Sequence, residues 1–177
     1  AEETMQFRFS NGIATAAPAI DVVDATPVTA GCRGVKDDHE IELMKLANEV
    51  TLTAYKATYH AMEEGMTQGD VGALISAAHA RLGFTGGASV QTGEWSALPH
   101  GSITPQVIRE GTILLIDGGC GVEGYRSDMS RTFVLGQPTD IMRERFEIEL
   151  EAQTAAHAAA GPGVLPEDVD AAARKVI

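Results

Sequence analysis

The feature that most constrains the fold is an order of elements that occurs twice: a long helix, a glycine and a short helix. In the first copy, Asp37 is suited to begin a helix, and apolar residues then recur every three or four positions as far as Gly65. A short helix follows, because Thr67 and Asp70 have the spacing of a capping box and the apolar pattern continues to Gly83. We therefore expect two successive helices with a glycine between them.

The second copy lies towards the end of the chain. Pro138 begins a helix predicted over residues 141–160, and Pro166 begins another that continues to Ile177. Three residue types keep the same spacing in the two copies, as Gly65, Asp70 and Val71 and again as Gly163, Asp168 and Val169. Either an internal duplication of a helix–helix–sheet unit or two ordinary helix hairpins with similar caps would produce this pattern. A duplication predicts that the chain ends within its second copy.

The segment between the two copies has the character of a sheet. Over residues 84–136 glycines recur, and short β-branched or apolar runs occur at residues 88–90, 113–116 and 132–134. We expect strands there, with a hairpin turn over residues 121–124. The fold class that follows is α+β.

Residues 1–36 are the least regular part of the chain. Residues 19–23 have the pattern of a short strand, and Ala-Thr and Ala-Pro steps with three glycines interrupt the rest. The segment is too short for a domain. We therefore expect the tail of an N-terminal domain and a linker that leads to the helix at Asp37.

Composition narrows the classes of function. The 177 residues carry 13 basic and 25 acidic side chains, which give a formal net charge of −12. Such a surface repels the phosphate backbone, so we expect no nucleic-acid partner. No apolar run reaches the roughly 18 residues that a membrane-spanning helix needs, so we expect no membrane partner either. Two cysteines do not make a disulfide framework, and this usage favours the reducing cytoplasm.

Two aspartates in the strand-rich segment are candidate metal ligands. Asp117 follows the apolar run 113–116, a predicted buried strand, where an ionised carboxylate is costly unless it is paired or bound to a metal. The predicted hairpin would bring Asp128 onto the neighbouring strand, and a divalent cation between two carboxylates removes their repulsion. Hard ions of the Mn²⁺ type favour such oxygen ligands. Alternatively, Asp117 lies in a plain turn and Asp128 pairs with Arg126 or Arg131.

His100, in the sequence Pro99-His100-Gly101, is a candidate catalytic residue, although a loop histidine after a proline more often has no catalytic role. The other histidines lie in helix patterns without ligand-like spacing, and we expect them to be solvated or partly buried. They are His39, His60, His79 and His157. The sequence contains no Ser-His-Asp signature, P-loop or dinucleotide fingerprint.

Taken in order, three segments resemble the pita-bread metallopeptidases, and among these the prolidase and aminopeptidase P branch. They are Ala97–Gly101, Glu110–Gly119 and Gly124–Gly136, and similar residues also occur at Arg33–Lys36 and Asp168–Arg174. The resemblance covers about residues 30–177. It implies a catalytic domain of two similar halves, with an antiparallel sheet and helices on one side. It also implies that residues 37–177 are the N-terminal half of this domain, with the second half absent from the chain.

The resemblance implies an activity, the hydrolysis of Xaa-Pro bonds in short proline-containing peptides by an Xaa-Pro dipeptidase or aminopeptidase. Asp117 and Asp128 match ligands of the family's two-metal site, the second of them bridging both ions, and His100 matches a histidine that assists the substrate. Mn²⁺ is the expected metal, with Co²⁺ or Zn²⁺ as alternatives, and the two ions activate a bridging hydroxide. The family's other ligands, one histidine and two glutamates, are expected in a complementary C-terminal segment of the same polypeptide. A homodimer in the cytoplasm is expected as well.

Three other interpretations stay open at this point. A methionine aminopeptidase shares the fold, although Pro99 and the residues around Asp128 argue against it. A creatinase-type hydrolase uses the same fold without metal, and the two aspartates argue against that activity. A non-catalytic pita-bread module that binds protein is the third, and metal content and hydrolysis of an Xaa-Pro dipeptide would test it.

Overall fold

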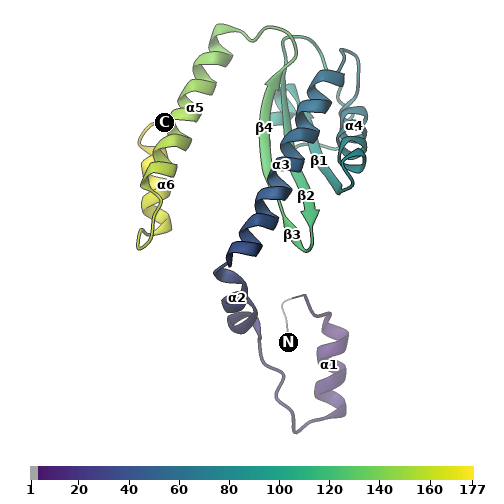
Figure 1. Ribbon diagram of the computed structural model, residues 1–177, viewed down its shortest axis with the longest axis vertical. Helices are drawn as coiled ribbons and strands as arrows, with labels where there is room; N and C mark the ends of the chain where they lie inside the picture. Colours follow the sequence, from purple (N-terminus) through teal and green to yellow (C-terminus); the bar gives the residue numbers. More distant parts are fainter. Residues whose placement is uncertain (1–3) are drawn as a thin grey trace.

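The computed structural model describes residues 4–177, which form helices and one antiparallel sheet (Figure 1). The elements in chain order are α1 Phe7–Ala16, α2 Thr26–Gly34, α3 Asp38–Ala61, α4 Gln68–Arg81, β1 Thr85–Thr92, the 3-10 helix η1 Gly93–Ala97, β2 Ile113–Val122, β3 Tyr125–Arg126, β4 Met129–Val134, α5 Asp140–Ala159 and α6 Pro166–Arg174. None of the described helices is long and apolar enough to cross a bilayer. The predicted α+β class is confirmed.

The helix start predicted at Asp37 and the capping box predicted at Thr67 and Asp70 are both confirmed, and Asp37 also forms a capping box. Asp37 accepts a hydrogen bond from the N–H of Glu40 at 2.8 Å, and the Glu40 side chain accepts one from the N–H of Asp37 at 2.7 Å. Thr67 and Asp70 make the same reciprocal contacts at the start of α4. Each box satisfies N–H groups that the first turn of a helix otherwise leaves free, which fixes where the helix begins.

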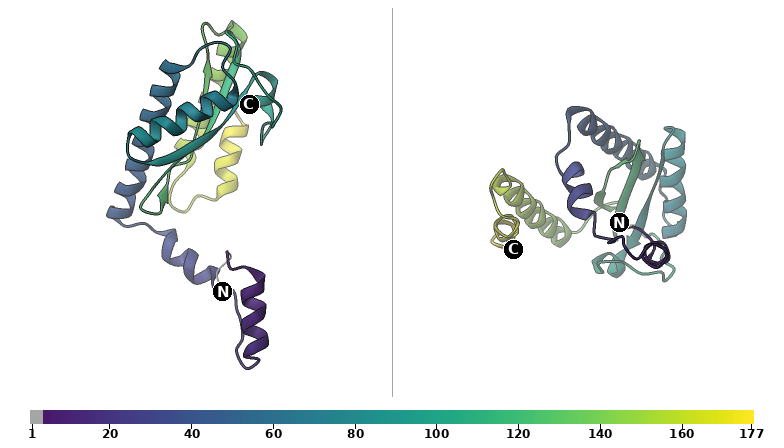
Figure 2. Two further views of the ribbon diagram at one scale, coloured as in Figure 1. Left: turned by 90° about the vertical axis from the view of Figure 1, so that its right-hand side faces the viewer. Right: turned by 90° about the horizontal axis from the view of Figure 1, so that it is seen from below.

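β2 is the central strand of the sheet, and all of its pairings are antiparallel. β1 pairs along one edge, and β3 and β4 follow one another along the other edge in a register interrupted only at Ser127 and Asp128. The two-residue turn Glu123-Gly124, with φ of 47° and 90°, joins β2 to β3 within the predicted turn. α3 and α4 pack on the same face of the sheet (Figure 1, Figure 2). The predicted antiparallel sheet with helices on one side is confirmed.

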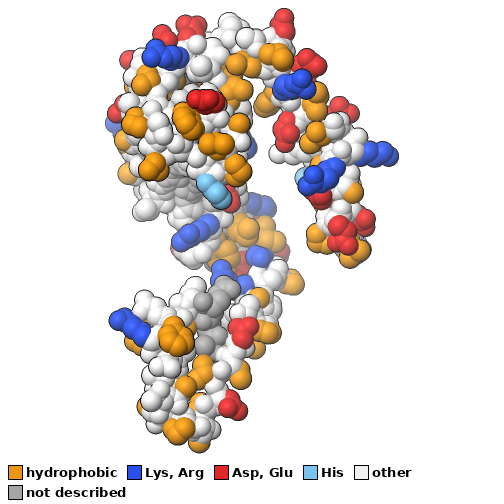
Figure 3. All heavy atoms as spheres, turned by 180° about the vertical axis from the view of Figure 1, so that it is seen from behind, with side chains coloured by type: hydrophobic (Ala, Val, Ile, Leu, Met, Phe, Trp, Pro, Cys, Tyr) orange, Lys and Arg blue, Asp and Glu red, His pale blue; other side chains and the backbone are white. Residues whose placement is uncertain are grey.

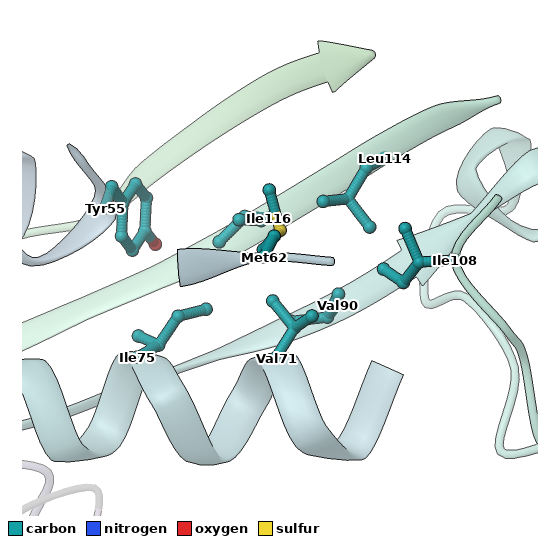
Figure 4. Close-up of a cluster of buried hydrophobic side chains, with 8 residues drawn as sticks. All are labelled: Tyr55, Met62, Val71, Ile75, Val90, Ile108, Leu114 and Ile116. Atoms are coloured by element: carbon teal, nitrogen blue, oxygen red, sulfur yellow. The ribbon is translucent and has the colours of Figure 1, made fainter. Parts of the chain in front are cut away.

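The side chains of β2 alternate between the two faces of the sheet, and one face carries the core. Leu114, Ile116, Cys120 and Val122 point towards the helices and are buried. The larger of two apolar clusters on this face is drawn in Figure 4 and contains Tyr55, Met62, Val71, Ile75, Val90, Ile108, Leu114 and Ile116. Burying an aliphatic side chain of this size contributes roughly 1.5–3 kcal/mol, so these contacts hold α3 and α4 to the sheet.

Three sequence predictions about elements were wrong. Residues 19–23 are not part of a strand, and they form the connection between helices α1 and α2. The last helix ends at Arg174 and does not continue to Ile177. β2 runs through Asp117 to Val122, so this aspartate lies within the strand and not in a turn at its end.

His79 is completely buried, contrary to the expectation from the sequence. Its Nδ1 lies 2.9 Å from the carbonyl oxygen of Ile75, one turn earlier in α4. The ring packs on the backbone of β1 at Gly86, where an added Cβ would stand 2.5 Å from the ring. A side chain other than glycine at that position would therefore displace the histidine. The four-residue spacing from Ile75, which belongs to the apolar face, is the signal that could have predicted this burial.

α5 and α6 form a helical hairpin that stands beside the sheet (Figure 1). Ala152 is the buried residue of α5, while Ile141, Phe146 and Leu150 keep about half or more of their side chains exposed. Figure 3 shows hydrophobic side chains on the surface of both the hairpin and the sheet.

Candidate metal centre

Asp117 lies on the face of the sheet that α3 and α4 leave open. Paired residues of antiparallel strands share a face, so Ser89 of β1 and Ser130 of β4 stand beside Asp117 on that face. The Ser130 hydroxyl donates a hydrogen bond to Asp117 Oδ1 at 2.6 Å. Asp117 is exposed, so the burial cost that the sequence analysis assigned to it does not apply. The strand is buried on one face only.

Asp128 shares this open face with Asp117. Extending the β2–β4 register by one pair beyond Gly118 and Met129 sets Asp128 opposite Gly119, which is two residues from Asp117 on the same face of β2. Diagonal neighbours of this kind in an antiparallel pair are about 7–8 Å apart, within reach of one another's side chains. The hairpin therefore brings Asp128, in the gap between β3 and β4, alongside the strand that carries Asp117.

Arg126 and Arg131, the alternative partners of Asp128, form no ion pair with it. Arg131 Nη1 donates instead to the carbonyl oxygen of Ser130 at 2.7 Å. The ion pairs that occur within residues 4–177 lie in α3 and α6. Two like charges thus share one face, and among residues 4–177 no cationic side chain is paired with either. A divalent cation would compensate them.

The chemistry of Asp117 and Asp128 fits a divalent metal, since hard cations prefer carboxylate oxygens. Across the part of the chain that the structure describes, no three His, Cys, Asp or Glu side chains gather in a group that could hold a metal ion. The described residues therefore supply two oxygen ligands on an open face, and further ligands would belong to another segment.

The strand that leads into Asp128 is interrupted because a side chain takes over a backbone hydrogen bond. The Ser127 N–H donates to the Cys120 carbonyl at 3.0 Å, but the Cys120 N–H donates to Ser127 Oγ at 2.9 Å instead of to the Ser127 carbonyl. The Ser127 carbonyl turns towards Gly119, where an added Cβ would lie 2.1 Å from its oxygen. The chain therefore crosses directly over Gly119 as it enters Asp128.

Helix α3 contacts both neighbours of Asp128 from the other side of the sheet. Thr51 Oγ1 lies 2.7 Å from Ser127 Oγ, and the Tyr55 hydroxyl donates to the Met129 carbonyl at 3.1 Å. Thr51 and Tyr55 are 0% and 2% exposed, and they stand one helical turn apart. The backbone on either side of Asp128 is thus tied to one helix.

The Tyr55 hydroxyl keeps its proton over a wide range of pH. Burial raises the pKa of Tyr55 to about 12, and the negative charges of Asp117 and Asp128 act in the same direction. The hydroxyl therefore remains a hydrogen-bond donor at neutral pH. Thr51 and Tyr55 are not among the site residues predicted from the sequence, because the apolar pattern that predicts α3 consists of aliphatic residues and methionine. The signal was present, since both follow Ala47 at the spacing of one helix face.

His100 lies in the loop after η1 and is exposed. The next residue, Gly101, rests on Gln91 of β1, because an added Cβ there would stand 2.1 Å from the Gln91 side chain. Gln91 pairs with Leu115, which is two residues from Asp117 on the same face of β2. The loop therefore carries His100 on the side of the sheet that holds the two aspartates.

Three glutamines anchor this loop. Gln106 Oε1 accepts the N–H of Thr92 at 2.7 Å, and Gln106 Nε2 donates to Gln91 Oε1 at 2.7 Å. Gln91 Oε1 also accepts the N–H of Ser102 at 2.9 Å, and Gln68 Oε1 accepts the N–H of Gln106 at 2.7 Å. A buried amide with satisfied polar atoms fixes the backbone that it contacts. The loop that carries His100 is thus held at its base.

Replacing Gln106 by alanine is expected to loosen the loop, because Thr92 N–H and Gln91 Oε1 lose their buried partner. An unsatisfied buried polar group costs about 1–3 kcal/mol, so the free energy of unfolding in urea should fall by about that amount. Amide hydrogen exchange over residues 99–104 should become faster. Gln153→Ala, at an exposed position of α5, is the control and should change neither quantity. Unchanged exchange in the Gln106 variant would show that other contacts hold the loop.

Comparisons with known proteins show the family of this chain. Residues 42–177 match the family described as metallopeptidase family M24. The Xaa-Pro dipeptidase of Pyrococcus furiosus is 35% identical to this chain over 148 residues, which are 82% of this chain and 42% of that protein. The Xaa-Pro dipeptidase of Lactobacillus delbrueckii subsp. lactis is 33% identical over 161 residues, 87% of this chain and 43% of that protein.

The fold agrees with a solved structure as well. The X-Pro aminopeptidase from Thermotoga maritima superposes with a TM-score of 0.89 at 31% identity, over 99% of this chain and 51% of that one. The chain thus spans about half of the length of these relatives, or less. The resemblance to the prolidase and aminopeptidase P branch, and the pita-bread fold that it implies, are confirmed. The chain belongs to metallopeptidase family M24.

Proposed function

We propose that this chain is part of a metal-dependent peptidase that hydrolyses Xaa-Pro peptide bonds, as an Xaa-Pro dipeptidase or an Xaa-Pro aminopeptidase. One observation carries the proposal: Asp117 and Asp128 are diagonal neighbours on the open face of the sheet, and within residues 4–177 neither is paired with a cation. Membership of a metallopeptidase family and the names of the relatives support it.

Asp117 and Asp128 would both hold the divalent metal ions. When bound, two such ions supply a hydroxide nucleophile at neutral pH and polarise the scissile carbonyl. We propose Mn²⁺, with Co²⁺ or Zn²⁺ as alternatives, because carboxylate oxygens favour a hard cation. Ser130 would keep the Asp117 carboxylate in one orientation through its hydrogen bond to Oδ1.

His100 would assist the substrate. Its loop is held over β1 by Gly101 and Gln91, on the face that carries Asp117. A neutral imidazole can donate a hydrogen bond to the oxygen of the scissile carbonyl and stabilise the negative charge that develops on it. The glutamine network at the base of the loop would keep that donor aimed at the site.

The remaining ligands, a histidine and two glutamates, would come from a complementary C-terminal segment of the same polypeptide. Two observations support this: the relatives are about twice as long as this chain, and the described residues offer no third ligand. Residues 37–177 would then be the N-terminal half of the catalytic domain, after a domain that ends in residues 1–36. A homodimer, a cytoplasmic location and short proline-containing peptides as substrates belong to the same proposal.

The full-length protein tests this proposal. We expect it to hydrolyse an Xaa-Pro dipeptide, to lose this activity after dialysis against a chelator, and to regain it with Mn²⁺. Native mass spectrometry should detect two divalent ions for each chain. A protein that binds no metal and hydrolyses no Xaa-Pro dipeptide would instead be a non-catalytic binding module. Removal of an N-terminal methionine from peptides without proline would identify a methionine aminopeptidase.

A further inference from the structure

We infer that Thr51 and Tyr55 of α3 are positioning residues for Asp128, and that they act by holding the residue on each side of it. The inference rests on the proposed function, because it concerns a carboxylate proposed as a metal ligand. It goes beyond the proposed function because it assigns a role in the metal site to α3, which packs on the opposite face of the sheet.

Asp128 needs such support because it lies outside both strands. β3 ends at Arg126 and β4 begins at Met129, so Ser127 and Asp128 form a gap in the ladder. At Ser127 the ladder bond from Cys120 goes to the hydroxyl instead of the carbonyl. Regular strand pairing alone therefore does not fix the conformation of Asp128, and the side chains around the gap must do so.

On one side of Asp128 a chain of hydrogen bonds leads back into α3. The Cys120 N–H donates to Ser127 Oγ at 2.9 Å, Ser127 Oγ lies 2.7 Å from Thr51 Oγ1, and Thr51 Oγ1 lies 3.6 Å from Cys120 Sγ. Cys120 Sγ in turn lies 3.3 Å from the carbonyl oxygen of Ala47. One placement of the protons satisfies all of these contacts, because each group can donate to the next. Removing the Thr51 hydroxyl would therefore break this series of hydrogen bonds.

On the other side, the Tyr55 hydroxyl donates to the Met129 carbonyl at 3.1 Å. Tyr55 belongs to the apolar core, and its ring is almost completely buried. The donor therefore has little freedom to move. It holds the first residue of β4 from the helix side of the sheet.

The two contacts suit the geometry of a helix beside a strand. Thr51 and Tyr55 are four residues apart, which is a rise of about 6 Å along a helix. Ser127 and Met129 are two residues apart, which is about 6.6 Å along a strand. One face of α3 can therefore hold both neighbours of Asp128 at once. The Asp128 carboxylate is then directed to the open face, towards Asp117.

The test is the Mn²⁺ affinity of the full-length, chelator-stripped protein, measured by calorimetry. Partners that orient a metal ligand typically change affinity 10- to 100-fold when removed, so Thr51→Val and Tyr55→Phe should each weaken Mn²⁺ binding roughly tenfold. Thr51→Ser keeps the hydroxyl and should retain the wild-type affinity. Thr53→Val and Tyr59→Phe, at exposed positions of α3, are the matched controls and should bind as wild type.

A second measurement separates positioning from folding. Unfolding of the metal-free variants in urea reports stability alone, and a loss of stability with unchanged Mn²⁺ affinity would overturn the inference. If Thr51→Val does not fold, the Mn²⁺ affinity of Tyr55→Phe tests the inference. Wild-type protein that binds no Mn²⁺ would overturn the proposed function and the inference with it. If the wild-type protein binds Mn²⁺ and both Thr51→Val and Tyr55→Phe bind it equally well, the inference is overturned and the proposed function is not.

Discussion

The variant Asp128→Ala of the full-length protein is expected to lose two-metal binding and Xaa-Pro hydrolysis together. A metal ion at a developing oxyanion contributes several kcal/mol of transition-state stabilisation, so kcat should fall by about a thousandfold or more. The carboxylate is exposed on the open face and contributes nothing to the core, so the protein should still fold. Metal content by mass spectrometry and turnover of an Xaa-Pro dipeptide check this prediction.

The assignment of Asp128 as a metal ligand also predicts the direction in which the free energy of unfolding changes. Without metal, Asp117 and Asp128 are like charges on one face, and neither has a cationic partner within residues 4–177. Asp128→Asn keeps the size of the side chain and removes one of the two charges. The free energy of unfolding of the metal-free variant should therefore be equal to that of wild type or slightly higher. If Asp128 instead stabilised the fold, Asp128→Asn would lower the free energy of unfolding.

The control for both variants is Asp21→Ala. Asp21 is an exposed aspartate between α1 and α2, so its removal changes the net charge without touching the sheet. We expect wild-type metal content and turnover in this variant. Wild-type turnover in Asp128→Ala itself would contradict the assignment of Asp128 as a metal ligand.

Much of the fold could be predicted because its signals are local. The capping boxes at Asp37 and Thr67 act within four residues, and the turn at Glu123-Gly124 acts within two. Those signals determine where α3 and α4 begin and which residues of β2 and β4 face one another. From the turn it follows that Asp128 lies alongside β2, the strand that carries Asp117.

The support of the site could not be predicted, because its contacts join distant parts of the chain. Thr51 and Ser127 are 76 residues apart in sequence, and Tyr55 and Met129 are 74 apart. No local pattern marks a buried threonine as the partner of a particular serine. The exposure of Asp117 was mistaken for a related reason, since a run of apolar residues does not show whether one or both faces of its strand are covered.

The substitution Gly119→Ala, in β2, is expected to weaken metal binding at the same proposed site. An added Cβ would stand 2.1 Å from the Ser127 carbonyl oxygen and 2.7 Å from the Ser127 carbonyl carbon. These are backbone atoms and cannot rotate away, so the chain that leads into Asp128 must move. We expect Mn²⁺ affinity to fall by at least tenfold, as for the loss of an orienting contact, and stability to fall by about 1–3 kcal/mol from overpacking.

Gly121→Ala is the matched control for that variant, on the same strand and the same face. A Cβ at Gly121 would meet only the Tyr125 carbonyl oxygen, at the ordinary contact distance of 3.8 Å. Replacing a strand glycine where there is room tends to stabilise, because the unfolded chain loses freedom. The two substitutions should therefore change the free energy of unfolding in opposite directions, although their chemistry is identical. Wild-type Mn²⁺ affinity in Gly119→Ala would mean that the path of the chain over Gly119 does not determine where the Asp128 carboxylate lies.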